Sequence, residues 1–296
     1  MQIDPRLALI NPPVDIFRRG PQSVPVILAS PHSGRHYPAP FQAASRLDPL
    51  ALRKSEDSFV DEIFLPASRL GAPLLRARFP RAYCDVNREP YELDPTMFDD
   101  DLPPHANTSS VRVAGGLGTI ARVVAGGEQI YRDKLQYAEA ERRIRHYYRP
   151  YHAALTDLVD GTLGTFGQCI LIDCHSMPSL ALPALSRRAG GGVGDRPDIV
   201  LGDRFGTSCD RSLTNQVDAA LTDLGYRVGR NAPYAGGFTT AHYGRPGLGL
   251  HALQIEINRA LYMDENRLTR RSTLTRISQD MAEMLRRVIE SVKPTQ

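Results

Sequence analysis

Three short polar clusters follow apolar, strand-like runs of this 296-residue chain. The first contains His32, the second contains His175, and the third contains Glu256; they follow the runs Val24–Ala29, Gln168–Ile172 and His251–Ile255. Open α/β sheets gather their functional groups where strands end at the carboxyl edge, so we expect these clusters to converge. Two histidines and an acid suit a catalytic zinc ion, which takes three protein ligands and leaves one position for water.

The third ligand is expected to be an acid near the start of the segment that follows the first strand. Glu56 and Asp57 are both candidates, and the sequence leaves the choice open. Each residue also has an ordinary structural explanation. The two acids could cap a helix, His32 could bond the backbone of a turn, and His175 could be a buried, hydrogen-bonded imidazole. The argument for a metal is the joint occurrence of these residues at strand ends.

Nucleophilic alternatives are weaker. Ser30, Ser33 and Ser176 lie beside the histidines, but the chain has no G-x-S-x-G elbow. Cys174 is adjacent to His175 in a predicted strand, and neighbouring strand residues point to opposite faces. We therefore expect the Cys174 and His175 side chains to diverge.

A possible substrate clamp lies in the stretch Asp85-Val86-Asn87-Arg88. An arginine beside an amide is well suited to gripping a carboxylate through paired hydrogen bonds. Arg78 and Arg81 are close in sequence and could share this role. The alternative is that Asp85 and Arg88 form a surface ion pair.

The pattern of the whole chain predicts an α/β fold in which a largely parallel sheet lies between layers of helices. We expect one domain covering residues 1–296. The segment 94–118, rich in Pro, Gly and Asp, is predicted to be a long loop, and Ser186–Asp195 a flexible one. The predicted strands are Val24–Ser30, Ala72–Phe79, Ala82–Val86, Gln168–Cys174, Asp198–Leu201, Tyr226–Val228 and His251–Ile257; the predicted helices are Asp57–Leu70, Glu128–Val159, Ser208–Leu224 and Glu265–Val292, with a possible interruption before Pro150.

Composition excludes several classes of protein. The net charge of +3 is small and spread out, which argues against nucleic-acid binding but permits a small anionic substrate. The four cysteines form no CxxC pair and are expected to be buried, reduced thiols. No signal peptide or membrane-spanning run is visible, so we expect a cytoplasmic protein without membrane partners. The oligomeric state does not follow from the sequence.

Several stretches in a fixed order resemble the N-formylglutamate amidohydrolase family over roughly residues 24–266. They are Pro31-His32-Ser33-Gly34, Glu56-Asp57, Arg81, Asp85-Val86-Asn87-Arg88, Arg149-Pro150-Tyr151-His152, Asp173-Cys174-His175-Ser176, Gly236-Gly237-Phe238, His242-Tyr243-Gly244, Gln254-Ile255-Glu256-Ile257 and Tyr262-Met263-Asp264-Glu265. Each motif is short, but their number and order are specific.

The resemblance implies a three-layer α/β/α architecture around a mixed, largely parallel central sheet, like that of zinc carboxypeptidases and aspartoacylases. It also implies roles for individual residues. One zinc ion, or another divalent metal, would be held by His32, Asp57 and His175, with Asp57 favoured over Glu56. Glu256 would act as general base and acid, Asn87 and Arg88 would bind the substrate carboxylate, and Arg81 and His242 would contact the substrate.

The implied reaction is hydrolysis of N-formyl-L-glutamate to formate and L-glutamate, in histidine breakdown. Two departures from the family pattern are visible: Ala241 stands where some members carry arginine, and Cys174 where alanine is familiar. Because Ala241 could remove a carboxylate contact, another N-acyl amino acid or a small peptide remains an alternative substrate. A non-catalytic ligand-binding relative is the alternative from another class, although such a protein would not need Glu256.

Overall fold

The computed structural model describes residues 9–179 and 196–292 of the chain. The chain divides into two compact units. Unit 1 comprises Met1–Asp15, Pro31–Ser58 and Arg76–Thr156, and unit 2 comprises Ile16–Ser30, Phe59–Leu75 and Asp157–Gln296. Neither unit is a continuous stretch of sequence, since each consists of three separate segments. The expected single domain over residues 1–296 stays a prediction.

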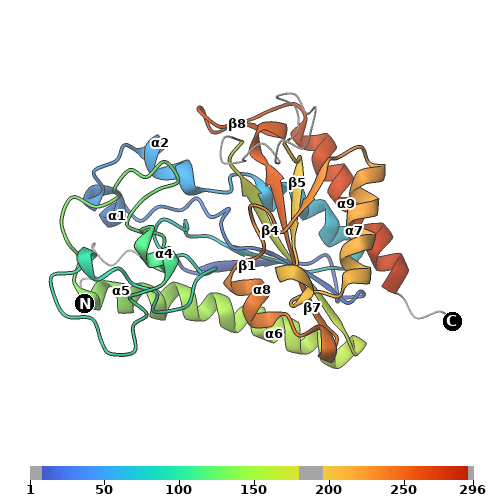
Figure 1. Ribbon diagram of the computed structural model, residues 1–296, viewed down its shortest axis with the longest axis horizontal. Coiled ribbons are helices and arrows are strands. Elements are labelled where there is room, and N and C mark those ends of the chain that lie inside the picture. Colours follow the sequence, from blue (N-terminus) through green and yellow to red (C-terminus); the bar gives the residue numbers. More distant parts are fainter. Residues whose placement is uncertain (1–8, 180–195, 293–296) are drawn as a thin grey trace. The chain divides into compact units, whose positions relative to one another are not determined.

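A seven-stranded sheet, which lies mostly in unit 2, organises the fold (Figure 1). Strands β2, β4 and β7 are parallel neighbours, β5 is antiparallel to β7, and β6 is parallel to β5. This arrangement confirms the expected α/β fold with a mixed, largely parallel sheet. The strands, in spatial order, are β1 (Val14–Phe17), β3 (Leu74–Ala77), β2 (Val26–Ser30), β4 (Cys169–Met177), β7 (Leu250–Asn258), β5 (Ile199–Gly202) and β6 (Val228–Arg230).

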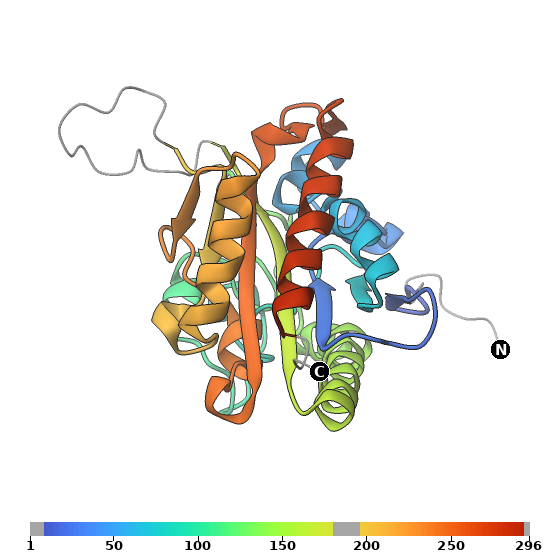
Figure 2. The ribbon, with the colours of Figure 1, turned by 90° about the vertical axis from the view of Figure 1, so that its right-hand side faces the viewer.

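One face of this sheet is apolar and is covered by helices of unit 2. Helices α7 (Arg211–Asp223) and α9 (Leu274–Val292) run side by side in Figure 2, and α3 (Val60–Phe64) packs against α9. Alternate strand residues supply the buried contacts, because side chains along a strand point to the two faces in turn. On β4 and β7 these residues are Ile170, Ile172, Cys174, Leu253, Ile255 and Ile257.

The intervening residues of β4 and β7 belong to the opposite face. Asp173 and His175 on β4 are paired in register with Gln254 and Glu256 on β7. All four side chains are buried. The same two-residue period that builds the apolar face therefore places two acids, an amide and an imidazole together on the other face.

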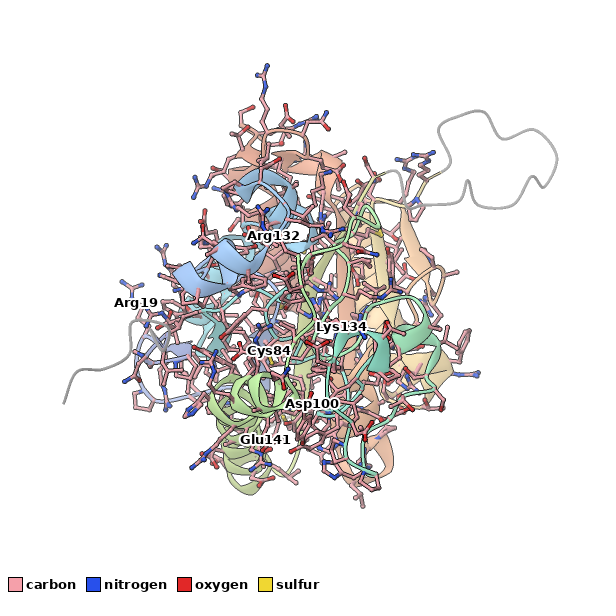
Figure 3. All side chains as sticks on the ribbon, turned by 90° about the vertical axis from the view of Figure 1, so that its left-hand side faces the viewer. Arg19, Cys84, Asp100, Arg132, Lys134 and Glu141 are labelled. Atoms are coloured by element: carbon pink, nitrogen blue, oxygen red, sulfur yellow. The ribbon has the colours of Figure 1, made fainter. Side chains whose placement is uncertain are left out.

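Unit 1 contains mainly short helices and irregular segments. The buried guanidinium of Arg143 lies 4.2 Å from the ring centroid of Tyr83 and donates to the Tyr131 hydroxyl and to Glu139. Figure 3 labels Cys84 in the interior of this unit and Glu141 on α5. The helices here are α1 (Ala39–Ala44), α2 (Pro49–Leu52), α4 (Val111–Ala114), α5 (Tyr137–Arg143), a π-helical turn (Ile144–Tyr148) and α6 (Arg149–Phe166), which continues into unit 2.

The remaining elements are short. In unit 2 they are α8 (Phe238–Tyr243) and the hairpin of β8 (Met263–Asp264) and β9 (Thr269–Arg270). The 3-10 turns of the two units are Arg53–Ser55, Leu65–Leu70, Pro95–Met97, Arg204–Gly206, Pro246–Leu248 and Arg259–Leu261. None of the described helices has the length and apolar character needed to cross a membrane.

Several predicted elements were wrong in type or extent. Ala82–Val86 is a turn and not a strand, because the Pro80 carbonyl accepts hydrogen bonds from the Tyr83 and Cys84 amides. The terminal helix begins at Leu274, since the β8–β9 hairpin occupies residues 263–270. Strand β1 was not anticipated. The predicted loop Ser186–Asp195 lies outside the described residues.

The other differences concern helix boundaries. The long helix predicted over Glu128–Val159 begins only at Tyr137, and a π-helical turn precedes Arg149, close to the interruption expected before Pro150. The Asp57–Leu70 prediction corresponds to α3 and the 3-10 turn Leu65–Leu70, in which Pro66 lies at the first turn. The segment 94–118 is largely irregular, as expected.

Candidate functional site

His32 lies in unit 1, two residues beyond the end of β2. The Pro31–Gly34 turn that carries it packs against Phe79, and a Cβ on Gly34 would lie 2.1 Å from the Phe79 carbonyl oxygen. Only glycine permits this close approach of two backbones. The tight contact fixes the turn and with it the position of His32.

The imidazole of His32 has a carboxylate near each ring nitrogen. Nε2 donates to Asp85 Oδ1 at 2.7 Å, and Nδ1 lies 3.5 Å from Asp57 Oδ2. The Asp57 amide also donates to the His32 carbonyl at 3.0 Å. Because Asp85 accepts a hydrogen bond from Nε2, the imidazole proton is held on Nε2. The lone pair of Nδ1 then points toward the side of Asp57.

Glu56, the other candidate acid, is engaged in a separate network of unit 1. Its carboxylate accepts hydrogen bonds from the Tyr37 hydroxyl at 2.7 Å, from the Ser58 hydroxyl at 2.8 Å, and from two nitrogens of Arg53. Burial raises the pKa of Tyr37 well above its ordinary value, and the Glu56 charge adds to this effect. These contacts favour a structural role for Glu56 and leave Asp57 as the acid beside His32.

Asp85 is a buried carboxylate surrounded by positive charge. Burial alone would raise its pKa, but the charges of Arg81 and Arg88 and the bond with His32 hold the pKa well below its ordinary value. Arg81 donates to Asp85 Oδ2 at 2.7 Å, and Arg88 Nη2 lies 3.6 Å from the same oxygen. Asp85 is therefore ionised at neutral pH and available as an acceptor for His32.

The predicted clamp residues Arg81, Asn87 and Arg88 differ in burial and in how many hydrogen bonds they make within the protein. Arg88 is buried; its Nε donates to the Leu117 carbonyl and its Nη1 to the Asn87 carbonyl. Burial lowers the pKa of Arg88 to about 10. The Arg81 side chain is 22% exposed, so it is the more accessible cation of the pair. Asn87 is buried, and its backbone N–H donates to Asp85 Oδ1 at 2.9 Å.

In unit 2, the sheet face opposite the apolar core carries His175 and Glu256 on neighbouring strands. His175 Nε2 lies 3.0 Å from Asp173 Oδ2, two residues earlier on β4. Glu256 Oε1 accepts from the Gln254 side-chain amide at 2.9 Å on β7. His175 thus resembles His32 in having a carboxylate at Nε2.

The other candidate residues lie elsewhere. His242 is on α8, exposed, and stacked on Phe238 with ring centroids 4.9 Å apart. Partial burial of the imidazole lowers the pKa of His242, and the charge of Arg245 lowers it further. Cys174 donates to the Ile172 carbonyl and belongs to the apolar face, as expected from strand geometry. The Ser176 hydroxyl accepts from Arg259.

His32, Asp57 and His175 are all buried, and their donor atoms are of the kinds that could hold a metal ion. The sequence did not identify the two carboxylates that contact these histidines. Asp173 could have been found, because residues two apart on a strand share a face. Asp85 could not, because 53 residues separate it from His32 and no periodic pattern links the two.

Comparison with known proteins identifies the family. A family model described as N-formylglutamate amidohydrolase matches residues 24–263. The chain belongs to this family. The resemblance expected from the motifs is therefore confirmed.

Two members of this family are similar to the chain over most of their length. The N-formylglutamate deformylase of Pseudomonas aeruginosa is 29% identical over 253 residues, covering 84% of this chain and 85% of that protein. The N-formylglutamate deformylase of Pseudomonas putida is 28% identical, covering 82% and 83%.

Solved structures agree with the family assignment. The N-formylglutamate amidohydrolase of Ralstonia eutropha JMP134 is 38% identical, with a TM-score of 0.86 over 95% of this chain and 98% of that chain. A protein from Agrobacterium tumefaciens has a TM-score of 0.60 at 18% identity, covering 95% of this chain and 94% of that one. At that identity the second similarity concerns the fold alone.

Proposed function

We propose that the protein is a zinc-dependent amidohydrolase that cleaves the C–N bond of N-formyl-L-glutamate to give formate and L-glutamate. The names of its relatives, two deformylases and one amidohydrolase of N-formylglutamate, support the reaction and the substrate. The observation that carries the metal dependence is the geometry around His32.

His32 and Asp57 fit a shared metal ion. Two ligands of a tetrahedral zinc ion, each at about 2.0–2.2 Å from it, stand roughly 3.4 Å apart. The 3.5 Å between His32 Nδ1 and Asp57 Oδ2 agrees with that spacing. Asp85 at Nε2 supplies the outer carboxylate that metal-binding histidines usually have.

We assign His175 to the same ion. Strand β2 pairs with β4 in the register Ala29↔Asp173, and His32 follows the last β2 residue, Ser30, by two positions. Consecutive Cα atoms are 3.80 Å apart, so the chain itself limits how far His32 can lie from the β4 end that carries His175. The Asp173–His175 pair repeats the Asp85–His32 arrangement, which supports the same role.

When bound, zinc would polarise the formyl oxygen and lower the pKa of a water molecule toward about 7. Glu256 is the residue of this chain suited to the proton transfers. It would accept a proton from the attacking water and deliver it to the departing amide nitrogen, which leaves poorly as an anion. The Gln254 amide orients the Glu256 carboxylate, since it donates to Oε1.

The substrate is a small anionic N-acyl amino acid, and arginines of unit 1 supply its charge complement. Arg81, Asn87 and Arg88 lie next to Asp85 and would bind the α-carboxylate, with His242 as a further contact. A role in histidine breakdown and a cytoplasmic location are part of the same proposal.

The decisive experiment measures formate release from N-formyl-L-glutamate together with metal content, before and after chelation. We expect release to stop on chelation and to return with zinc. The variant Glu256→Gln should keep the metal while losing about 10²–10⁴-fold in kcat, because it removes a proton-transfer group and no ligand.

Each other outcome points to a different conclusion. A zinc-containing protein that releases no formate, but cleaves other N-acyl amino acids or small peptides, would replace the substrate and keep the chemistry. A metal-containing protein that binds such compounds without cleaving any would favour the non-catalytic alternative. Absence of both metal and turnover would refute the proposed site.

A further inference from the structure

An N-acyl glutamate carries two carboxylates, and the residues assigned so far account for one. The α-carboxylate is two bonds from the amide nitrogen, so its partner must be close to the reacting group. Arg81 and Asn87 meet this condition because both contact Asp85, which binds His32. The side-chain carboxylate is two carbon atoms farther from Cα and needs a second, more distant cation.

Segment 110–119 of unit 1 is fixed against the clamp by a series of hydrogen bonds. The Asp85 amide donates to the Thr119 carbonyl at 2.8 Å, and the Thr119 amide donates to the Glu92 carbonyl at 2.8 Å. Gly118 approaches Glu92 so closely that a Cβ would lie 2.2 Å from its carbonyl oxygen. The segment therefore has a definite position relative to Asp85.

Arg112, on helix α4 of this segment, is linked to Arg88 by two further bonds. Arg88 Nε donates to the Leu117 carbonyl at 2.7 Å, and the Leu117 amide donates to the Arg112 carbonyl at 2.8 Å. The Ser110 side chain accepts from the Val113 amide and caps the same turn. A continuous series of contacts in one unit thus runs from His32 through Asp85, Arg88 and Leu117 to Arg112.

Arg112 is the cation of this region whose charge is not balanced. Arg81 pairs with Asp85, and Arg122 pairs with Asp94 at 2.7 Å. Among residues 9–179 and 196–292, by contrast, the Arg112 guanidinium has no ion pair or hydrogen bond, and it is exposed. Burial is the main cause of the lowered Arg88 pKa, and the charges of Arg81 and then Arg112 add to it. An exposed cation beside the clamp that no acid neutralises attracts an anionic group.

We propose that Arg112 binds the side-chain carboxylate of the substrate and thereby selects acidic N-acyl amino acids. This inference rests on the proposed function. Arg112 is a specificity residue and takes no part in the proton transfers. An exposed guanidinium on a long side chain can meet a carboxylate through two parallel hydrogen bonds.

The test compares two substrates that differ only in the second carboxylate. We expect Arg112→Ala to lower kcat/KM for N-formyl-L-glutamate by roughly tenfold or more, because the charge-assisted hydrogen bonds to one carboxylate are lost. The value for N-formyl-L-glutamine should stay within about twofold, because that substrate offers Arg112 no charge. Arg145→Ala is the matched control: Arg145 is an exposed arginine of unit 1 without an ion pair or hydrogen bond among the described residues, and its loss should affect neither substrate.

A second measurement separates this inference from the proposed function. Calorimetric titration with the products L-glutamate and L-glutamine needs no turnover, and Arg112→Ala should weaken only the binding of glutamate. Wild-type protein that does not hydrolyse N-formyl-L-glutamate would refute the proposed function, and the titration would still decide the role of Arg112. Equal losses for the acidic and amide ligands, or no loss for either, would overturn the inference.

Discussion

Each of the two candidate histidine ligands has a carboxylate at Nε2, and this is the most informative feature at the scale of single residues. Asp85 lies 2.7 Å from His32, and Asp173 lies 3.0 Å from His175. A buried imidazole with a fixed Nε2 proton can offer only Nδ1 to a metal ion. The two aspartates would thus position both ligands without contacting the metal.

This positioning role predicts the effect of Asp173→Asn. The amide is almost the same size, so the fold should persist, but the oriented Nε2–H bond to a charged acceptor is lost. We expect zinc affinity to fall by about 10–100-fold, as for other outer carboxylates of metal sites. Competition with a chelator of known affinity measures this directly, without reference to activity.

Asp157→Asn provides the control for that experiment, since Asp157 is an exposed acid of α6. Its zinc affinity should equal that of the unaltered protein. Unchanged affinity in Asp173→Asn, with the same sensitivity to chelator as the control, would mean that Asp173 does not position His175.

At the scale of elements, the two faces of β4 explain why Cys174 and His175 have different environments. Cys174 belongs to the apolar face with Ile170 and Ile172, whereas His175 belongs to the face shared with Glu256. The other three cysteines are buried as well. Burial also raises thiol pKa values, to about 12 for Cys169 and for Cys209, and well above the ordinary value for Cys174.

These thiols are therefore expected to resist modification in the native protein. At about pH 8 an ordinary thiol of pKa about 8.5 is partly ionised and reacts with aromatic disulfides, whereas a buried one does not. We expect no rapid reaction in the folded state and reaction of all four cysteines after unfolding in denaturant. A fast-reacting thiol in the folded protein, identified by peptide mapping, would show that its element is less buried than described.

Elements with a strong periodic pattern could be predicted from the sequence, and those determined by contacts could not. β4 was identified because its first residues form a near-continuous apolar run, and β7 because its apolar residues alternate with polar ones. Ala82–Val86 has similar composition, but Pro80 initiates a turn there. The hairpin at residues 263–270 was missed because its strands have two residues each, too short for any period.

The residues of the candidate site also fall into those that a sequence pattern predicts and those that only contacts reveal. His32, His175 and Glu256 were found because each lies close to the end of an apolar run. Spacing alone left Glu56 and Asp57 open, and only the family resemblance favoured Asp57. The contacts give the physical reason: Glu56 is bound by Tyr37, Arg53 and Ser58, residues that no sequence pattern connects to it. Arg112 was assigned only to a loop, because an uncompensated charge becomes visible only when its neighbours are known.

At the scale of the whole molecule, each of the two units is built from three separate segments of one continuous chain. The chain passes from one unit to the other after Asp15, Ser30, Ser58, Leu75 and Thr156. Neither unit corresponds to a continuous segment that could fold from its own sequence alone. The proposed ligands His32 and Asp57 lie within two residues of such crossing points, at Ser30 and Ser58.

We therefore expect the protein to unfold in one cooperative transition, with equal calorimetric and van't Hoff enthalpies. Because zinc would bind only the folded chain, it should raise the midpoint of that single transition. Free zinc at 100 times its dissociation constant adds about 2.7 kcal/mol to the free energy of unfolding. For a chain of this length, that raises Tm by several degrees. Differential scanning calorimetry with and without zinc, and with Asp57→Asn as the variant lacking a ligand, measures both effects. Two separate transitions, only one of them shifted by zinc, would contradict the single-domain prediction and would also mean that the ion is held within one unit.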